Sequence, residues 1–376
     1  MDWNTLNMSN DRIIIIGAGI AGTAAAYFLS RRGTGNIRIL EKERLAGTHS
    51  SGLNAAILRT MIPESVLNRL ARESAEFYLN PPDGFSQEPL VDKTGIYLAA
   101  SRGNESVLQG WCDENPETGM EPIPVERVYK RIPDLTHGLG MATWKADDGV
   151  MDIHAILQGF LRGAVRSGAE FCAEVEFLGL RTQNRRVTGV ETGNGFMEAA
   201  KVVVANGAWA SSTETFNGCG LPFIPYRRHL LVTEASPLMD SRQPVVWIAG
   251  EEFYFRPESS GLLMCGCDTV AVTPEQGETT DPDELERIAA KVSRWLPRFS
   301  DARIVKAWAG MRTFVPDEEF VIGADPRVEG LYWVAGLGGH GIACAPLIGR
   351  LAADWIVDGG SEHPAAAAFS PERLIN

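Results

Sequence analysis

The sequence lacks the cysteine spacing that disulfide frameworks and zinc sites need. Six cysteines are scattered along the chain, and none forms a CxxC pair. We therefore predict no metal centre, and a reducing cytoplasm is the default compartment. Cys265 and Cys267 lie in the apolar run LLMCGCD, which is typical of a strand, so we expect both side chains on one face. Free cysteines of this kind are usually buried and unreactive.

Positive charge is also scarce. The 35 Lys and Arg residues are outnumbered by 48 Asp and Glu residues, which gives a net charge of −13. This balance argues against nucleic acid and anionic membranes as partners, because both need a basic face. No stretch approaches the roughly 20 apolar residues of a transmembrane segment. The N-terminus, MDWNTLNMSNDR, lacks the basic start and apolar core of a signal peptide, so we expect a frayed leader in a cytoplasmic protein.

A strong local motif stands at residues 13–33, IIIIGAGIAGTAAAYFLSRRG, in a chain long enough for two domains. The four isoleucines predict a strand that is buried on both faces. Gly17 is expected to make a tight turn, Gly19 to leave room for a ligand, and Gly22 to let a helix at 20–32 pack on the sheet. The sequence therefore predicts the start of a βαβ unit.

The same unit carries the signature of dinucleotide binding. The helix N-terminus, at Ile20 and Ala21, would present free N–H groups to a pyrophosphate. A second strand at 37–40 ends in Glu41, near the roughly 20-residue offset expected of the acid that binds a ribose hydroxyl. A glycine turn that only packs helix on strand is the alternative, but it does not explain the acid. Because a carboxylate repels a 2′-phosphate, FAD and NAD remain as candidates.

The rest of the chain favours FAD over NAD. We expect a polar loop that turns helical at 47–63, helices at 64–78, 149–168 and 281–297, and strands through 169–210 and 221–275. The buried strand at 202–204 is followed by a second small-residue turn. A third strand–glycine–helix unit comes only at the C-terminus, at 331–359. An NAD domain would need its second half sooner, so an extended FAD fits better.

Five motifs together carry a resemblance to a known family. They are GAGIAG with its acid, GTHSSG, NGAWA, WAGMRTFVPDEEFVIG and GLGGHGIACAP. With them the chain resembles, over nearly its whole length, the D-amino-acid oxidase superfamily of FAD enzymes, which includes glycine oxidase, sarcosine oxidase and D-amino acid dehydrogenases. Within that group FYLNPPDGFSQEPLV, EEFYFRP and WAGMRTFV look most similar to bacterial D-arginine dehydrogenase.

The resemblance implies an α/β fold in two domains. A discontinuous Rossmann-like FAD-binding domain would take residues 1–85, 150–215 and 308–376. A second α+β substrate domain, built on a large mixed β-sheet, would take 86–149 and 216–307. The implied reaction is oxidative deamination of a D-amino acid. A hydride leaves Cα for flavin N5, and the resulting imine hydrolyses to a 2-oxo acid and ammonia.

The resemblance also assigns residues to the substrate. Arg312 matches a position that binds the substrate carboxylate, for which a planar guanidinium is well suited. Arg227 matches a second active-site arginine, although a register shift of one would select Arg228; a surface ion pair is the alternative for each. Tyr254 matches a tyrosine that meets the carboxylate. Glu88 matches an acid that faces a cationic substrate, as in the D-arginine type.

Cofactor contacts are implied in the same way. The loop after GT would lie beside the flavin ring, backbone amides of the GGHG turn would face its pyrimidine oxygen, and one backbone position would bind adenine. We predict non-covalent FAD, because GTHSSG is not the pattern of covalent relatives and Gly310 stands where sarcosine oxidases carry a cysteine. The full predicted set is Gly17, Gly19, Ile20, Ala21, Gly22, Glu41, Lys42, His49, Ser50, Ser51, Val175, Asn206, Gly207, Trp209, Gly338, Gly339, His340, Gly341 and Ile342.

Two departures from the family pattern bear on function. No tyrosine occurs between Tyr27 and Tyr78, where the D-arginine type carries a lid tyrosine; Ile57 and Leu58 stand there. Met264 stands where sarcosine-type oxidases use a lysine to activate oxygen. We therefore expect a dehydrogenase that passes electrons to a quinone rather than to O2. A glycine- or sarcosine-type oxidase and a non-catalytic FAD-binding subunit remain as alternatives, and the oligomeric state is open.

Overall fold

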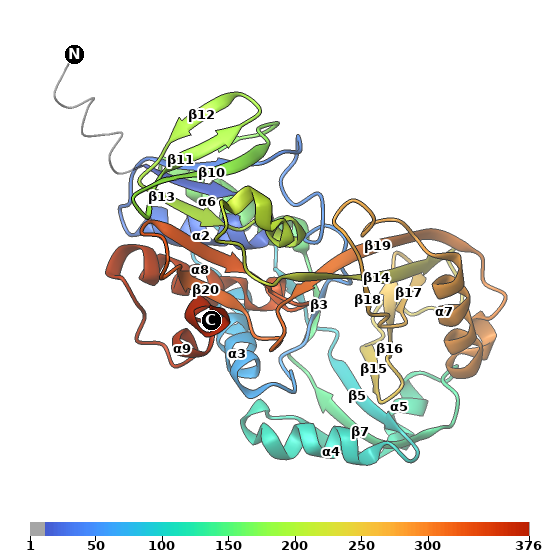
Figure 1. Ribbon diagram of the computed structural model, residues 1–376. Helices are drawn as coiled ribbons and strands as arrows, with labels where there is room; N and C mark the ends of the chain where they lie inside the picture. The colour runs from blue at the N-terminus through green and yellow to red at the C-terminus, as the bar shows by residue number, and fades with distance from the viewer. Residues whose placement is uncertain (1–11, 376) are drawn as a thin grey trace.

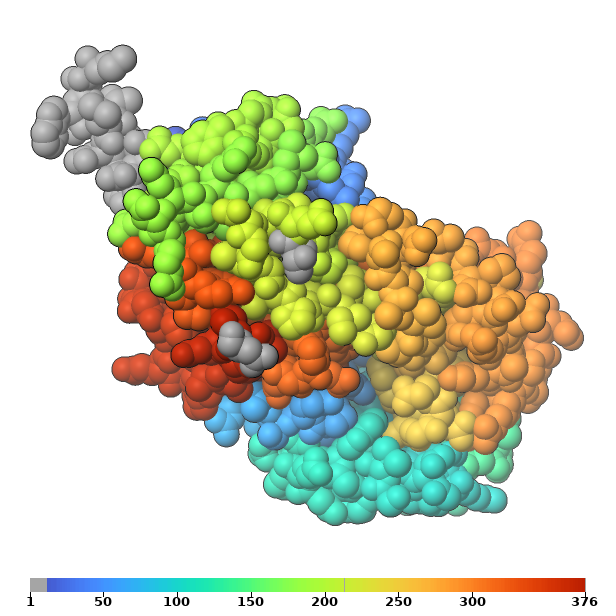
Figure 2. Space-filling view, in the orientation of Figure 1, coloured from blue at the N-terminus to red at the C-terminus, as the bar shows by residue number. Residues whose placement is uncertain are grey.

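The computed structural model describes residues 12–375, so the leader expected at the N-terminus lies outside the described residues. The described chain forms two lobes, each built on a large β-sheet (Figure 1). On the surface, residues around 100–140 and 240–305 gather over one lobe, and both ends of the described chain lie on the other (Figure 2). This arrangement confirms the predicted α/β fold with a second lobe on a large mixed sheet.

The first sheet has six strands, and all neighbours are parallel except β20 and β21. The four isoleucines of β1 form its centre and are fully buried, as their β-branched, apolar character predicts. The spatial order is β20 (Val321–Ala324), β21 (Leu331–Ala335), β13 (Lys201–Val204), β1 (Ile13–Ile16), β2 (Ile37–Leu40) and β9 (Glu170–Cys172).

Helices pack on this sheet because glycines let them approach. A Cβ on Gly22 would lie 1.9 Å from the Gly17 carbonyl oxygen, so only glycine allows this close contact. Gly17 itself has φ +98°, where an added Cβ would lie 2.6 Å from the Ala205 carbonyl oxygen. The helices of this lobe are α2 (Ile20–Arg31), α3 (Ser65–Leu79), α6 (Ile153–Arg166), α8 (Gly341–Asp358) and α9 (Ala365–Ala368).

The second sheet has nine strands and is mixed, because β5 and β15 run parallel while the other pairs are antiparallel. One face of this sheet packs on α7, whose N-terminus is capped by the side chain of Asp281. The elements of this lobe are α4 (Glu105–Glu114), α5 (Val125–Arg131), α7 (Pro282–Trp295), β5 (Ile96–Ser101), β6 (Glu121–Ile123), β7 (Leu139–Lys145), β14 (Ile224–Thr233), β15 (Val245–Ala249), β16 (Phe253–Glu258), β17 (Gly261–Cys265), β18 (Val270–Ala271) and β19 (Ile304–Phe314).

Two small sheets complete the fold, and one of them corrects a prediction. The helix expected within 47–63 is wrong: Ile57 and Leu58 form a strand, because they pair with residues 149–150. The helix expected within 149–168 is found from 153 to 166, and Asp152 caps it by accepting a bond from the Ala155 amide at 2.8 Å. These sheets are β3 (Ile57–Leu58), β8 (Gly149–Met151) and β4 (Val91–Asp92), and β10 (Phe177–Gln183), β11 (Arg186–Thr192) and β12 (Gly195–Glu198).

The predicted domain limits stay a prediction, and one of them cuts a strand. The predicted limit at residue 308 falls inside β19, whose whole length pairs with β14 in the nine-stranded sheet. A long strand that starts in one lobe and ends beside the other carries residues toward the space between them. The candidate site lies at that end of β19.

Candidate active site

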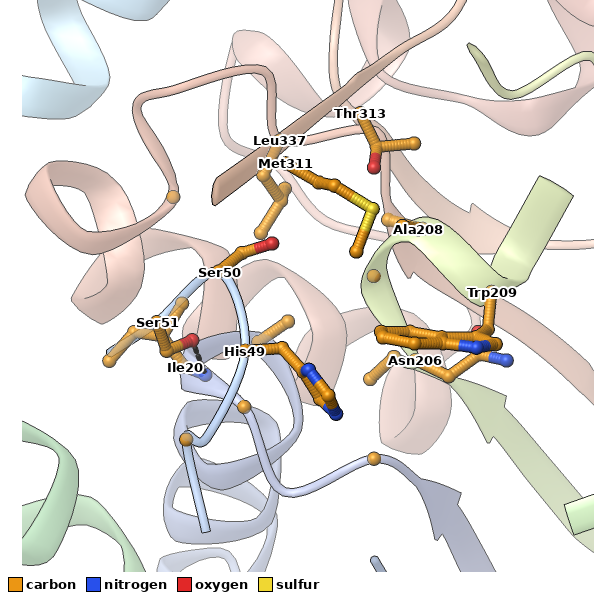
Figure 3. Close-up of a pocket in the computed structure, with 18 of the residues that line it drawn as sticks. Ile20, His49, Ser50, Ser51, Asn206, Ala208, Trp209, Met311, Thr313 and Leu337 are labelled. Carbon is orange, nitrogen blue, oxygen red and sulfur yellow. Dashed lines mark hydrogen bonds between the residues drawn. The ribbon is translucent and has the colours of Figure 1, made fainter. Parts of the chain in front are cut away.

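The larger cavity lies at the carboxyl ends of β1, β2, β13 and β21, where open parallel sheets bind their ligands. Turns from widely separated parts of the sequence surround it (Figure 3). Every residue predicted to bind the cofactor lines this cavity except Gly22, which packs α2 on the sheet, and His340. Those that line it are Gly17, Gly19, Ile20, Ala21, Glu41, Lys42, His49, Ser50, Ser51, Val175, Asn206, Gly207, Trp209, Gly338, Gly339, Gly341 and Ile342.

Ser51 joins the second loop to the start of α2. Its hydroxyl oxygen accepts a hydrogen bond from the Ile20 amide at 2.9 Å (Figure 3). A Cβ on Gly19 would lie 3.2 Å from the same oxygen, so a larger residue would crowd this contact. The loop therefore rests directly on the helix N-terminus, where an anion is favoured.

The carboxylate of Glu41 is buried at the end of β2. One oxygen accepts from the Ala18 amide at 2.9 Å and the other from the Glu43 amide at 3.0 Å. Each carboxylate oxygen keeps a second lone pair that a ribose hydroxyl could use. The Val175 amide donates to the Glu41 carbonyl at 2.9 Å, so only the Val175 carbonyl is left to meet adenine. Both roles stay predictions.

His49 and Trp209 form one wall of the cavity, with ring centres 4.5 Å apart (Figure 3). The His49 ring is fixed at both nitrogens, 2.7 Å from a Glu278 oxygen and 3.0 Å from a Glu43 oxygen. The Lys42 ammonium lies 3.5 Å from the centre of the Trp209 ring. These side chains hold one another, so they shape the cavity as a preformed wall.

A second cavity adjoins the first. The two share Asn54, Arg312 and part of the turn that precedes α8. The walls of the second cavity come from both lobes: residues after the GTHSSG loop, strands of the nine-stranded sheet, and the start of α8. A group bound at the junction would contact both cavities. A flavin ring in the larger cavity would meet a substrate in the second cavity there.

Arg312 and Arg228 bring two guanidinium groups into this second cavity. The Arg312 group donates to the carbonyls of Met311 at 2.9 Å and Leu53 at 3.2 Å. Arg228 donates to the Asp268 carbonyl and to the Thr269 hydroxyl, both at 3.2 Å. Within the described chain neither guanidinium forms an ion pair, and burial lowers the pKa of Arg312. Two cations with only neutral partners are suited to bind an anion.

Arg59 is a third arginine in the same cavity, and the sequence analysis missed it. Its side chain is buried, with the residue 8% exposed, and the guanidinium carbon lies 4.0 Å from the centre of the Trp247 ring. Its Nη2 lies 3.3 Å from His340 Nε2. Burial lowers the pKa of Arg59. The available signal was a single charge inside the apolar stretch AAILRTMIP.

His340 places its ring, as well as its backbone, at the site. Burial first, and then the three nearby guanidinium groups, lower its pKa to about 3. The imidazole is therefore neutral at physiological pH, and Nε2 accepts the hydrogen bond from Arg59. The ring therefore adds no positive charge to the cavity near neutral pH.

Tyr254 lines the second cavity, as its predicted role requires. It is buried, and its ring stacks on Trp247 with ring centres 4.4 Å apart. Burial, followed by the nearby Cys265 and Cys267 thiols, raises the pKa of the phenol well above its usual value. The hydroxyl therefore keeps its proton and can donate to an anion.

Two predicted substrate residues lie elsewhere. Arg227 lines neither cavity, because neighbouring residues of β14 point to opposite faces; its guanidinium pairs with Asp281 at 2.7 Å. Arg228, which a register shift of one would select, lines the second cavity in place of Arg227. Glu88 is exposed, bonds through its backbone to the Ser86 hydroxyl, and lines neither cavity.

The oxygen-activating position also needs a correction. Met264 packs into the core beside α7, on the far face of the large sheet. Cys265 pairs with Tyr254 across the strands and lies in the same cluster as that tyrosine, on the face opposite to Met264. Cys267 lies beyond the end of the strand, with φ 54°. No lysine is found among the described residues that line the second cavity.

Comparison with known proteins identifies the family. Residues 12–355 match the family model described as DAO, FAD dependent oxidoreductase. The chain belongs to this family. FAD is therefore its cofactor, and the larger cavity fits it, with a glycine turn, a helix N-terminus and a buried acid in the required order. When bound, FAD supplies a two-electron acceptor for a hydride.

The relatives share a low sequence identity with this chain, but the matches extend over most of its length. Glycine oxidase of Pseudomonas aeruginosa is 26% identical, and the match covers 92% of this chain and 94% of that protein. The mitochondrial pyruvate dehydrogenase phosphatase regulatory subunit of Mus musculus is also 26% identical over 93% of this chain, which spans only 41% of that protein. The crystal structure of glycine oxidase from Bacillus cereus ATCC 14579 matches with a TM-score of 0.80 at 25% identity, covering 94% and 96% of the two chains.

Two features of the described residues bear on compartment and metals. None of the helices in the described range is long and apolar enough to cross a membrane. Within the same residues, no group of three or more His, Cys, Asp or Glu side chains could hold a metal ion.

Proposed function

We propose that the protein oxidises the amine carbon of an amino acid, or of an N-substituted amino acid, using FAD. The observation that carries this proposal is the junction of the two cavities at Arg312. A substrate carboxylate held there by Arg312 and Arg228 would place Cα–H beside the flavin ring. The neutral Tyr254 hydroxyl would donate to the same carboxylate.

The arginines also prepare the amine. Three guanidinium groups in one cavity disfavour a bound ammonium and lower its pKa, so the amine binds with its lone pair free. That lone pair forms the carbon–nitrogen double bond as the hydride leaves Cα with two electrons. Water then adds to the imine and releases a 2-oxo acid and ammonia, or an amine. No side chain of the described cavity needs to remove a proton from carbon.

The finer points of the proposal are the stereochemistry of the substrate and the identity of the electron acceptor. A D-amino acid is the expected substrate, and the similarity to glycine oxidases supports glycine or sarcosine as the second candidate. Absence of a lysine from the described lining supports a non-oxygen acceptor such as a quinone. Non-covalent FAD is supported because none of the six cysteines lines the larger cavity and His49 is bound at both nitrogens. Acid precipitation should release free flavin.

The cationic, D-arginine-like substrate has lost its support. It rested on an acid at position 88, which is exposed and lines neither cavity. In its place the cavity presents three guanidinium groups, which repel a second positive charge. We therefore do not propose D-arginine as the substrate.

Anaerobic bleaching of the flavin tests the proposal. The holoprotein is mixed with D- and L-amino acids, sarcosine and proline while the flavin absorbance band is followed. Bleaching by any of them supports amine oxidation, and the identity of the active compounds selects between the candidates. Reoxidation by a quinone should then be faster than by air. If none of the compounds bleaches bound flavin, the proposed substrate class is wrong and a non-catalytic subunit is favoured.

A further inference from the structure

The substrate cavity carries more positive charge than one carboxylate can neutralise. Arg59, Arg228 and Arg312 all line it, and no acidic residue does so among the described residues. His340 adds no charge, because its pKa lies at about 3. A substrate with a single carboxylate, bound by Arg312 and Arg228 together, would leave the Arg59 guanidinium without an anionic partner in a largely buried space, which is unfavourable.

The three arginines form two separate anchors. Arg228 and Arg312 stand on paired strands, where Tyr226 faces Arg312 and Arg228 faces Gly310, so both guanidinium groups are on one face of the sheet. Arg59 follows β3 and rests instead on Trp247 and His340. One carboxylate can bind the first anchor, while the second anchor needs its own.

Acids near Arg59 do not supply that partner. The buried Asp148 carboxylate accepts bonds from the Thr60 amide at 2.8 Å and the Thr60 hydroxyl at 2.9 Å, and it forms no ion pair with Arg59 within the described chain. Glu64 acts on Arg59 only through its longer-range field. The two groups in contact with the guanidinium, Trp247 and His340, are neutral. Arg59 is therefore held in place but left free to bind an anion.

We propose that the substrate is a dicarboxylic amine, with one carboxylate bound by Arg312 and Arg228 and the second by Arg59 beside Trp247 and His340. This inference rests on the proposed function and names its substrate class. Compounds of this chemistry are D-aspartate, D-glutamate and iminodiacetate. Arg59 is then the residue that selects an acidic substrate, because a guanidinium binds a carboxylate with paired hydrogen bonds.

Pairs of compounds that differ by one carboxylate test the inference. The holoenzyme is assayed with D-aspartate against D-asparagine, D-glutamate against D-glutamine, and iminodiacetate against sarcosine. We expect kcat/KM to be at least about 100-fold higher for the dicarboxylate in one or more pairs. The other member of each pair lacks the second carboxylate and leaves the Arg59 guanidinium unpaired. Equal or better turnover of the uncharged members overturns the inference while the proposed function stands. If no member of any pair bleaches the flavin, the proposed function fails as well.

Variants of Arg59 separate selection from general damage. Arg59→Gln should remove the preference, lowering kcat/KM for the acids about 100-fold and for the amides less than about 3-fold. Arg59→Lys should keep part of the preference, and it replaces the first variant if that one does not fold. Arg227→Gln is the matched control, because Arg227 lies outside the cavity. An equal loss for acids and amides in both Arg59 variants would contradict the inference.

Binding without turnover gives an independent readout. Succinate and glutarate should perturb the flavin absorbance band at concentrations at least about tenfold lower than propionate and butyrate. In Arg59→Gln the dicarboxylates should bind no more tightly than the monocarboxylates. If wild-type protein binds both groups equally, Arg59 does not provide a second carboxylate site.

Discussion

The two adjoining cavities are built in different ways. The FAD cavity is made mostly of backbone turns at the ends of parallel strands, where small residues let a ligand approach. The substrate cavity is made of side chains from β14, β16, β19, the residues after β3, and the turn before α8. The FAD cavity depends on positions where a side chain must be missing, whereas the substrate cavity depends on particular side chains that must be present. Substitutions should therefore damage the two cavities by different mechanisms.

The largest loss of activity is expected from Gly22→Ala, because this variant should lose its cofactor. The new Cβ would lie 1.9 Å from the Gly17 carbonyl oxygen, so α2 must move away from the sheet. We expect loss of bound FAD and a destabilisation of about 1–3 kcal/mol, as for overpacking in a core. Flavin absorbance after purification and thermal unfolding measure both. Gly35→Ala is the control, because its Cβ would meet nothing within 4 Å; equal behaviour of the two variants would contradict the backbone account.

Arg312→Ala should leave FAD binding intact and damage the chemistry. Removing one partner of a buried charge pair costs about 2–5 kcal/mol, so kcat/KM should fall at least about 30-fold. Stopped-flow reduction of the flavin measures the loss, and the absorbance spectrum of the bound flavin checks that the cofactor is retained. A variant that is reduced at the wild-type rate would favour the non-catalytic subunit.

The buried Asp148, bonded to Thr60, predicts a pH dependence of stability. Burial, partly offset by bonds from Thr60, raises its pKa from 3.8 to about 6. Because the folded-state pKa is the higher one, this group favours the folded state below about pH 4, and that contribution is lost as the pH rises to about 6. The change is about 3 kcal/mol. Denaturant unfolding of wild-type protein and Asp148→Asn from pH 4 to 7 should show this slope only in the wild type. Parallel curves would show that Asp148 is not its source.

The smallest effect is expected from Glu88→Gln. Glu88 is exposed and lines neither cavity, so kcat/KM for any substrate should change less than about twofold. Steady-state assays with the best substrate and with D-arginine measure this. A tenfold loss confined to D-arginine would restore the cationic substrate and weaken the difference drawn between the cavities.

The sequence predicted the FAD cavity well because its determinants are local. The strand, the glycines and Glu41 fall within one βαβ unit, and spacing along the chain places them together. The helix within 149–168 is found behind its cap, Asp152, while residues 149–151 before the cap form β8. The helix predicted within 47–63 was wrong, because pairing with β8 overrode local propensity.

The substrate cavity was predicted less well because its contacts are distant in sequence. Arg59 and His340 are 281 positions apart, and no local pattern joins them. Arg227 and Arg228 differ only in which face of β14 they occupy, and a shift of one residue exchanges those faces. Met264 and Cys265 likewise lie in clusters on opposite faces of the sheet.

By itself, the sequence determined that this chain contains a dinucleotide-binding βαβ unit, because glycine spacing and strand hydrophobicity are properties of neighbouring residues. The choice of FAD over NAD came from the late third strand–glycine–helix unit and from the resemblance to a known family. Only the tertiary structure decided which arginines meet, which of them lack an acidic partner, and that Glu88 stands apart. Those facts depend on the phase of each strand and on the packing of one lobe against the other. Electrostatic complementarity to a substrate arises from that packing, so the sequence could not specify the substrate's charge.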